Sequence, residues 1–171
     1  MTVEIRRGSA RFVTREPGRQ TRHAFSFGAH YDPERLSFGP LVCHDEHLLG
    51  STAGFETHRH SGLVILSWVV EGVLRHTHDD AAPVDLPAGS LGVLVTGEGV
   101  QHSEVAAGVP TRFVQVWLSD PDADTHPLRH AVTTPAAAPA VGVAYRPGAE
   151  HVDRVAPVAV HDLAHSVGAV G

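Results

Sequence analysis

The sequence predicts an all-β fold, an antiparallel jelly-roll barrel followed by a short C-terminal extension. From Thr2 to about Ser119, short β-branched and aromatic segments alternate with turn residues at a spacing of roughly 8–12 residues, which is typical of sandwiches and barrels. No window in this part carries a sustained apolar period of about 3.6 residues, so helices are not expected there. The 17 glycines and 12 prolines provide many turns.

The predicted strands begin with two short β-prone pieces near the N-terminus, Phe12–Val13 and Phe25–Phe27. The longest apolar run, Leu63–Val70, is nearly continuous in β-branched and aromatic residues. Such a run predicts a strand that is buried on both faces.

A turn at Glu71-Gly72 ends this run, and Val73–His78 is its predicted hairpin partner. Strand alternation places His76 and His78 on the same face as Leu74. The two histidines either line the interior of the barrel or form a polar pair on the surface of the hairpin.

Four more strands are predicted downstream, between turns marked by Gly, Pro or Asp: Val84–Leu86, Leu91–Val95, Val100–Val105 and Phe113–Leu118. In the last of these, Phe113, Gln115 and Trp117 share one face. Gln115 is polar in an otherwise apolar strand, so it is a candidate for lining the interior.

The composition changes after the last of these strands, where an acidic and polar segment begins. Thr133–Pro139 predicts a linker, and Val141–Arg146 and Val155–Leu163 predict two further strands. We therefore divide the chain into an N-terminal domain, residues 1–120, and residues 121–171, which hold the linker and a short or truncated C-terminal segment.

The composition also argues against several functional classes. The formal net charge of −6 disfavours direct binding of nucleic acid, and Leu63–Val70 is too short to span a bilayer. Cys43 is the only cysteine, so no intrachain disulfide can form, and the N-terminal residues lack the apolar segment of a signal peptide. The sequence therefore predicts a cytoplasmic protein without a membrane or nucleic-acid partner.

Two pairs of potential metal ligands occur among the 14 histidines. One residue separates His58 from His60, and one separates His102 from Glu104, so in extended chain each pair lies on one face. Imidazole and carboxylate ligands with open positions suit Fe(II) in oxygen chemistry and are compatible with Mn, Ni, Cu or Zn. The alternative is that these are polar residues near the mouth of the barrel that bind no metal.

The first pair follows Gly-Phe, and the second lies in a Gly-x-Gly-x-x-His-x-Glu motif. The segments that carry a resemblance to a known family are His23–Pro33, Phe38–Leu41, Gly54–His60, Val70–Gly72, His76, Pro87–Gly89 and Thr96–Glu104. Together they resemble the N-terminal cupin barrel of the pirin family, within the cupin superfamily, over roughly residues 3–120.

The resemblance implies a cupin barrel with one metal ion, usually iron, bound by His58, His60, His102 and Glu104. Some pirins have quercetin 2,3-dioxygenase activity, so one hypothesis is a metal dioxygenase for a flavonol-like or enediol substrate, with Glu104 as the catalytic base. A second is a non-catalytic, metal-dependent regulator that binds a transcription factor or a metabolic enzyme. A third is a metal-free structural barrel.

Two features depart from the family pattern. A glutamate usually follows the first histidine pair, and Val64 occupies that position here. We expect the metal site to survive this change, but any role of that carboxylate beside the metal or as an acid or base to be lost. Pirins usually carry two barrels, and residues 121–171 are too few for a second one, which predicts a short form or an incomplete chain.

Other candidate residues have weaker support. Phe55 and Trp68 either border the substrate cavity or belong to the core. His76 matches a family position and is a candidate for lining the cavity. A group without a family match is predicted to lie in a loop: Cys43, His44, Asp45 and His47.

Overall fold

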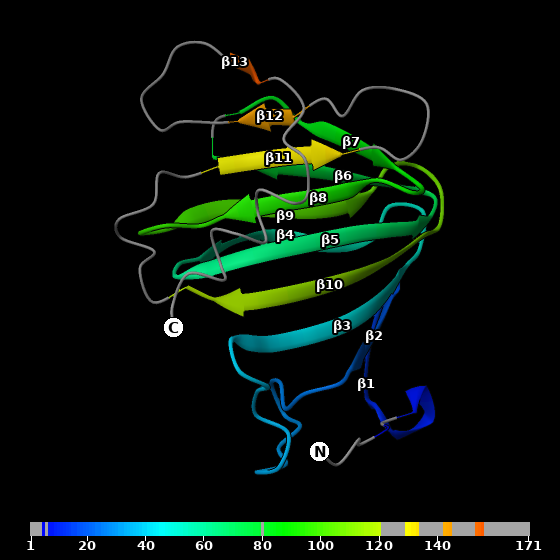
Figure 1. Cartoon of the computed structure of the whole chain (residues 1–171). Coiled ribbons are helices and arrows are strands. Elements are labelled where there is room, and N and C mark those ends of the chain that lie inside the picture. Colours follow the sequence, from blue (N-terminus) through cyan, green and yellow to red (C-terminus); the bar gives the residue numbers. More distant parts are fainter. Residues whose placement is uncertain are drawn as a thin grey trace.

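Segments with β-branched and aromatic residues form strands throughout the described part of the chain. The computed structural model describes Ile5, residues 7–79 and 81–120, and the strand backbones at 129–133, 142–144 and 153–155. In these residues two antiparallel sheets face each other as the layers of a jelly roll, which confirms the predicted fold class (Figure 1). None of the described helical residues forms a segment long and apolar enough to cross a membrane.

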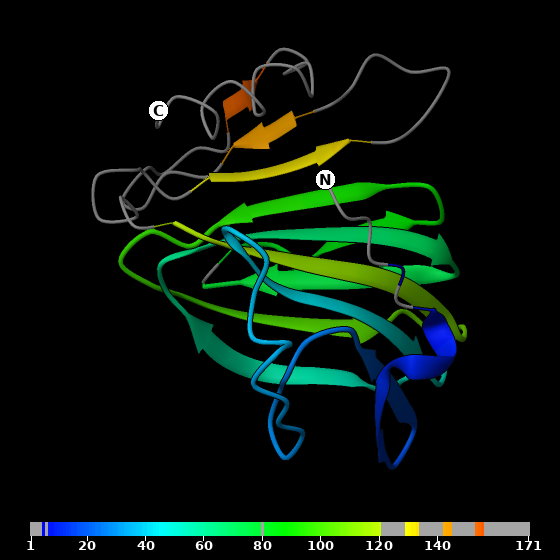
Figure 2. The same ribbon diagram turned by 60° about the horizontal axis from the view of Figure 1, so that its bottom comes forward.

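The larger sheet contains seven strands in the order β1-β2-β3-β10-β5-β8-β11. Their bounds are Phe12–Glu16 for β1, Arg19–His23 for β2, Leu41–Leu49 for β3, Thr111–Ser119 for β10, Leu63–Glu71 for β5, Leu91–Val95 for β8 and Arg129–Thr133 for β11. The β1–β2 hairpin and the loop between β2 and β3 project from one end of this sheet (Figure 2). A short 3-10 helix, η1 (Gly8–Ala10), precedes the hairpin.

The smaller sheet contains four strands in the order β4-β9-β6-β7. Their bounds are Gly54–His60 for β4, Val100–Ala106 for β9, Val73–His78 for β6 and Val84–Pro87 for β7. The four strands predicted downstream of His78 are therefore confirmed as β7 to β10.

Two further strands, β12 (Gly142–Ala144) and β13 (Asp153–Val155), pair with each other. β12 lies within the strand predicted at 141–146. The predicted linker, Thr133–Pro139, begins with the last residue of β11, and the rest of it lies outside the described residues. Most of the strand predicted at 155–163 also lies outside them.

Apolar side chains from both sheets meet between them and form the core. The first cluster consists of Leu49, Val69 and Phe113 from the larger sheet and Leu74, Leu86 and Ala106 from the smaller one. A second cluster consists of Ile65, Leu94 and Val100. Burying a large apolar side chain contributes about 1.5–3 kcal/mol. These clusters therefore hold the sheets face to face and bound the space in which the interior polar groups lie.

The predicted hairpin between β5 and β6 is wrong, because the two strands belong to different sheets. Gly72 connects them with a φ of 80°, in the left-handed region that favours glycine. A Cβ at this position would overlap the carbonyl oxygen of Pro110. The chain thus crosses from one layer to the other at Gly72, and β6 pairs with β9 instead.

The strand β5 is buried on one face only, so the prediction of two buried faces is also wrong. Ile65, Ser67 and Val69 point inward and are at most 5% exposed. On the opposite face, Trp68 is 45% exposed and Val70 is 37% exposed. A run of apolar residues does not reveal which face the second layer covers.

The predicted strand at Phe25–Phe27 is replaced by a bend with a single bridge from Phe27 to His30. The Ser26 hydroxyl donates to the carbonyl oxygen of Asp32 at 2.9 Å and accepts from its backbone N–H at 2.8 Å. Such local side-chain bonds compete with strand pairing, and here they close the loop instead.

His47, on β3, is a buried imidazole in the interior. Its Nδ1 lies 3.0 Å from the Thr21 hydroxyl, and its ring centroid lies 4.6 Å from that of Phe113 and 4.8 Å from that of Phe55. Burial lowers the pKa of His47 to about 4, because the site solvates an imidazolium poorly, although the Asp45 carboxylate opposes the shift.

We predict that His47 makes folding stability decrease as the pH falls from about 6.5 to about 4. In the unfolded chain, His47 binds a proton below its ordinary pKa of 6.5, and the folded protein excludes that proton down to about pH 4. This linkage amounts to about 2 kcal/mol between about pH 7 and pH 5. Urea unfolding in the presence of a chelator measures it. The substitution His47→Leu should reduce the pH dependence by that amount, and an unchanged pH dependence would contradict the assignment.

Candidate metal centre

The pairing of β4 with β9 sets His58 opposite His102 and Phe55 opposite Glu104. The three-residue step from Phe55 to His58 in β4 therefore spans only the two-residue step from Glu104 to His102 in β9. A regular strand would put Phe55 and His58 on opposite faces, and this bulge turns both inward. Gly54 begins β4 so close to β9 that a Cβ there would overlap the backbone of Glu104.

Three histidines converge on one point at the inner face of this strand pair. His58, His60 and His102 each offer a ring nitrogen, and these three atoms lie within 4.8 Å of one another. Nitrogen ligands bound to one metal at about 2.1 Å lie about 3–4 Å apart, so the spacing fits a shared ion after small adjustments. His58 and His60 are half-buried and His102 is buried, so the group is open to solvent on one side.

Hydrogen bonds determine which nitrogens can face an ion. His58 Nδ1 donates to the carbonyl oxygen of Glu56 at 2.7 Å, which leaves its Nε2 with a free electron pair. His60 Nε2 is buried and has no hydrogen-bond partner among the described residues. Burial, and then the neighbouring His58, lower the pKa of His60 to about 4, so its imidazole is neutral near pH 7, the form that binds metals.

Glu104 is held inside the barrel by donors from the facing sheet. The Ser67 hydroxyl donates to Oε1 at 2.9 Å, and the Gln115 amide donates to Oε2 at 2.7 Å. Trp117 Nε1 donates to the Gln115 carbonyl oxygen at 2.8 Å and so fixes the direction of that amide. Burial raises the pKa of Glu104, whereas both hydrogen bonds and the nearby His58 oppose the rise.

Glu104 groups with a different pair of histidines. Its carboxylate and one ring nitrogen each of His76 and His102 lie within 4.8 Å of one another, and all three residues are buried. His76 Nε2 and His102 Nδ1 share a hydrogen bond of 3.0 Å. The described residues therefore contain two overlapping groups of ligand atoms. One holds the three histidines of β4 and β9, the other surrounds Glu104, and His102 belongs to both.

The other candidate residues lie partly inside and partly outside the interior. His76 and His78 point inward and are each 3% exposed, so they line the interior rather than the surface of a hairpin. Phe55 packs against the core beside His58. Trp68 lies on the outer face of β5 and does not border the interior.

The aromatic residue that sequence reasoning missed as a neighbour of the site is Trp117, whose ring centroid is 4.6 Å from that of His60. Phe27 makes a T-shaped contact with this indole, and the two ring centroids lie 5.6 Å apart. The sequence contained a signal for this position, because Gln115 and Trp117 are two residues apart in one strand and therefore share a face. If Gln115 lines the interior, Trp117 must face inward as well.

The prediction of a loop is wrong for one group of residues, which lies in the strand β3: Cys43, His44, Asp45 and His47. Its members alternate between faces: Cys43, Asp45 and His47 are buried inside, and His44 points to the outer face. Burial, and then the neighbouring Asp45, raise the pKa of the Cys43 thiol. These residues form no metal-ligand group of their own in the described structure.

Val64 lies on the outer face of β5, opposite to the inward Ile65 and Ser67. A carboxylate at this position would point away from His58 and Glu104. The expected loss of an acid or base beside the metal therefore does not follow, because that side chain does not reach the interior.

The facing sheets and the inward group of histidines with a carboxylate define the class: a jelly-roll protein of the cupin type. The family model described as Pirin matches residues 6–118. The chain belongs to the pirin family.

The chain is also similar to individual known proteins. The bacterial pirin YhhW from Escherichia coli, solved in complex with nickel(II), aligns with a TM-score of 0.71 at 26% identity, over 77% of this chain and 57% of that one. A Mycobacterium tuberculosis protein named "Putative quercetin 2,3-dioxygenase Rv0181c" is 38% identical over 124 residues, 71% of this chain and 50% of that protein. The quercetin 2,3-dioxygenase of E. coli K12 is 32% identical over 98 residues, 56% and 42% of the two chains. The chain thus spans about half the length of the curated relatives it matches.

We predict that Gln115→Leu lowers the free energy of unfolding by about 1–3 kcal/mol, because the buried Glu104 loses one of its two donors. Urea denaturation near neutral pH measures the change. The same substitution at Gln101, on the exposed face of β9, is the matched control and should change stability by less than about 0.5 kcal/mol. Equal effects at both positions would show that Gln115 does not support the carboxylate.

Proposed function

We propose that this protein binds one divalent metal ion through His58, His60, His102 and Glu104, and that it is an oxygenase of the quercetin 2,3-dioxygenase type. The observation that carries the proposal is the convergence of three histidine nitrogens within 4.8 Å, one of which, His60 Nε2, is buried without a hydrogen-bond partner among the described residues. A buried polar atom without a partner is costly, and a metal ion would satisfy it.

The ligand chemistry favours Fe(II), as do the open positions that four protein ligands leave in an octahedral shell. Mn, Ni, Cu and Zn are compatible with the same donors, and nickel(II) is the ion in the related YhhW structure. Glu104 completes the proposed set because its carboxylate lies beside His102 and within electrostatic reach of His58. The hydrogen bond between His76 and His102 orients the His102 ring, as outer partners of metal-binding histidines commonly do.

When bound, the metal supplies Lewis-acid and redox chemistry for the reaction of an electron-rich oxygen substrate with O₂. The surrounding residues suit a flat aromatic substrate: Trp117 borders His60, and Phe27 packs against Trp117 and is 44% exposed. Glu104 is positioned by Ser67 and Gln115 to accept the proton of a substrate hydroxyl group. A flavonol or another enediol-type compound meets these requirements.

The metal site is tested by elemental analysis of protein purified without a chelator. We expect about one ion per chain in the wild type and a large loss in His60→Ala, because one ligand is gone. His76→Ala should bind the same ion about 10–100-fold more weakly, since it removes only the partner that orients His102. His44→Ala, on the outer face of β3, is the matched control and should keep the wild-type content. Equal metal content in wild type and His60→Ala would contradict the site.

The activity is tested by oxygen uptake with quercetin and a panel of catechol-like compounds, using protein loaded with Fe, Mn, Ni or Cu. We expect uptake by at least one loaded form and none by His60→Ala prepared in the same way. Full metal content with no oxygen uptake in any combination would contradict the oxygenase and favour the metal-dependent regulator. In that case a partner should be recovered only from metal-loaded protein.

A further inference from the structure

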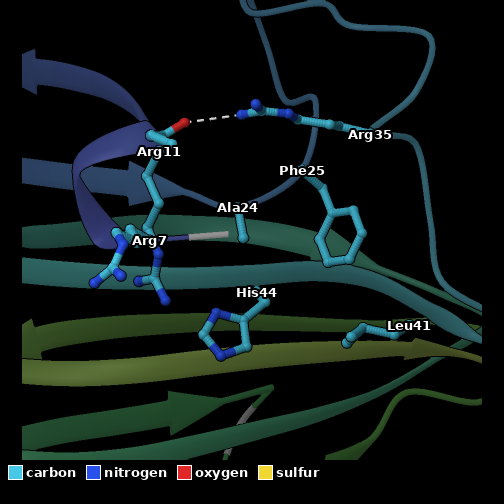
Figure 3. Close-up of a pocket in the computed structure, with 8 residues that line it drawn as sticks. Arg7, Arg11, Ala24, Phe25, Arg35, Leu41 and His44 are labelled. Atoms are coloured by element: carbon cyan, nitrogen blue, oxygen red, sulfur yellow. Dashed lines mark hydrogen bonds between the residues drawn. The ribbon is translucent and has the colours of Figure 1, made fainter. Parts of the chain in front are cut away.

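A second candidate binding site lies on the outer side of the larger sheet, between the N-terminal segment, the loop after β2 and β3. It is a pocket of about 220 Å³. Figure 3 shows Arg7 and Arg11 reaching toward His44 on one side of the pocket, with Phe25 and Leu41 on the other. Arg35 closes the rim by donating to the carbonyl oxygen of Ala10 at 2.8 Å.

This pocket is separate from the proposed metal site. His44 lines it from the outer face of β3, whereas its neighbours Cys43 and Asp45 point into the barrel. A ligand here would therefore be separated from the interior by the thickness of the sheet.

The lining of the pocket is positively charged although the whole chain has a formal charge of −6. Three arginines line it, and none of the described residues that line it is acidic. Like charges held close together repel each other, so such a pocket attracts an anion.

The acidic residues nearby do not neutralise these arginines fully. Arg11 lies 3.9 Å from the Glu46 carboxylate, but Arg22 and Arg112 pair with the same carboxylate. Arg35 pairs with Asp32 at 3.1 Å. Arg7 makes no ion pair with any described residue, and its guanidinium presents a donor fork suited to a carboxylate or phosphate.

The uncharged residues of the lining indicate two further properties of a ligand that would fit the pocket. His44 Nδ1 is buried and has no hydrogen-bond partner among the described residues, so a ligand atom would satisfy it. Phe25 and Leu41 provide an apolar wall next to the charged groups. A pocket of this size, below the roughly 300–1,000 Å³ of sites for drug-sized ligands, fits a small molecule only.

We propose that this pocket binds a small amphiphilic anion. Arg7 and Arg11 hold its carboxylate or phosphate group, and Phe25 and Leu41 contact an apolar body of about the size of one aromatic ring. Because the site is on the opposite face of β3 from the proposed metal centre, the proposal does not depend on that centre or on oxygenase activity.

Calorimetric titration of the full chain with benzoate, phenyl phosphate, inorganic phosphate and benzyl alcohol tests the proposal. We expect saturable binding of benzoate or phenyl phosphate, and the tighter of the two identifies the head group. Benzyl alcohol lacks the charge and inorganic phosphate lacks the apolar body, so each should bind at least about tenfold more weakly. The double variant Arg7→Gln, Arg11→Gln should weaken binding of the tighter probe at least about tenfold.

Three variants keep the test specific. Arg7→Gln alone removes no ion pair to a described residue, so it is expected to fold normally and still to weaken binding several-fold. Arg15→Gln removes the same charge from the exposed end of β1 and should leave binding unchanged. His60→Ala should also bind the anion normally, which separates this pocket from the metal site. Absence of saturable binding, loss of binding in His60→Ala, or unchanged binding in the arginine variants would overturn the proposal.

Discussion

The close pairing of β4 with β9 is the constraint on which the interior site depends. The absence of a side chain at Gly54 lets the two strands approach each other closely. The bulge after Phe55 turns His58 and His60 inward, where His58 lies opposite His102 and His60 opposite Val100. Arg19 fastens this corner to β2, since its guanidinium donates to the carbonyl oxygen of Gly54 at 2.7 Å and lies 4.2 Å from the Phe55 ring centroid. If β4 slipped by one residue against β9, His58 and His60 would turn toward solvent.

The facing sheet supplies the second half of the arrangement. A buried carboxylate is unfavourable unless donors surround it, and Glu104 receives one from each of two neighbouring strands, at Ser67 and Gln115. These bonds tie the two layers together at the proposed metal centre, so the groups that would bind the ion are held by the same contacts that close the jelly roll. The shared position of His102 makes it the link between the histidine group and the carboxylate.

Strand alternation predicted much of this from the sequence, including the strands β7 to β10 and the facing of His76 and His78 with Leu74. Other features depend on which strands pair, and local residue patterns do not encode that. The change of sheet at Gly72 was missed because a turn between two strands resembles a hairpin until the layers are known. The outward positions of Val64 and Trp68 were missed because an uninterrupted apolar run hides its orientation. The arginine pocket was missed because Arg7, Arg11 and Arg35 come together only when the loop after β2 folds back.

The proposed site requires that one ion is shared by His58, His60, His102 and Glu104 rather than by the overlapping group around His76. A crystal structure of metal-loaded protein, with anomalous data at the absorption edge of that metal, tests it most directly. We expect one peak at about 2.0–2.3 Å from a ring nitrogen of each of the three histidines and from a carboxylate oxygen of Glu104. A peak bound by His76, His102 and Glu104 without His58 and His60 would contradict it.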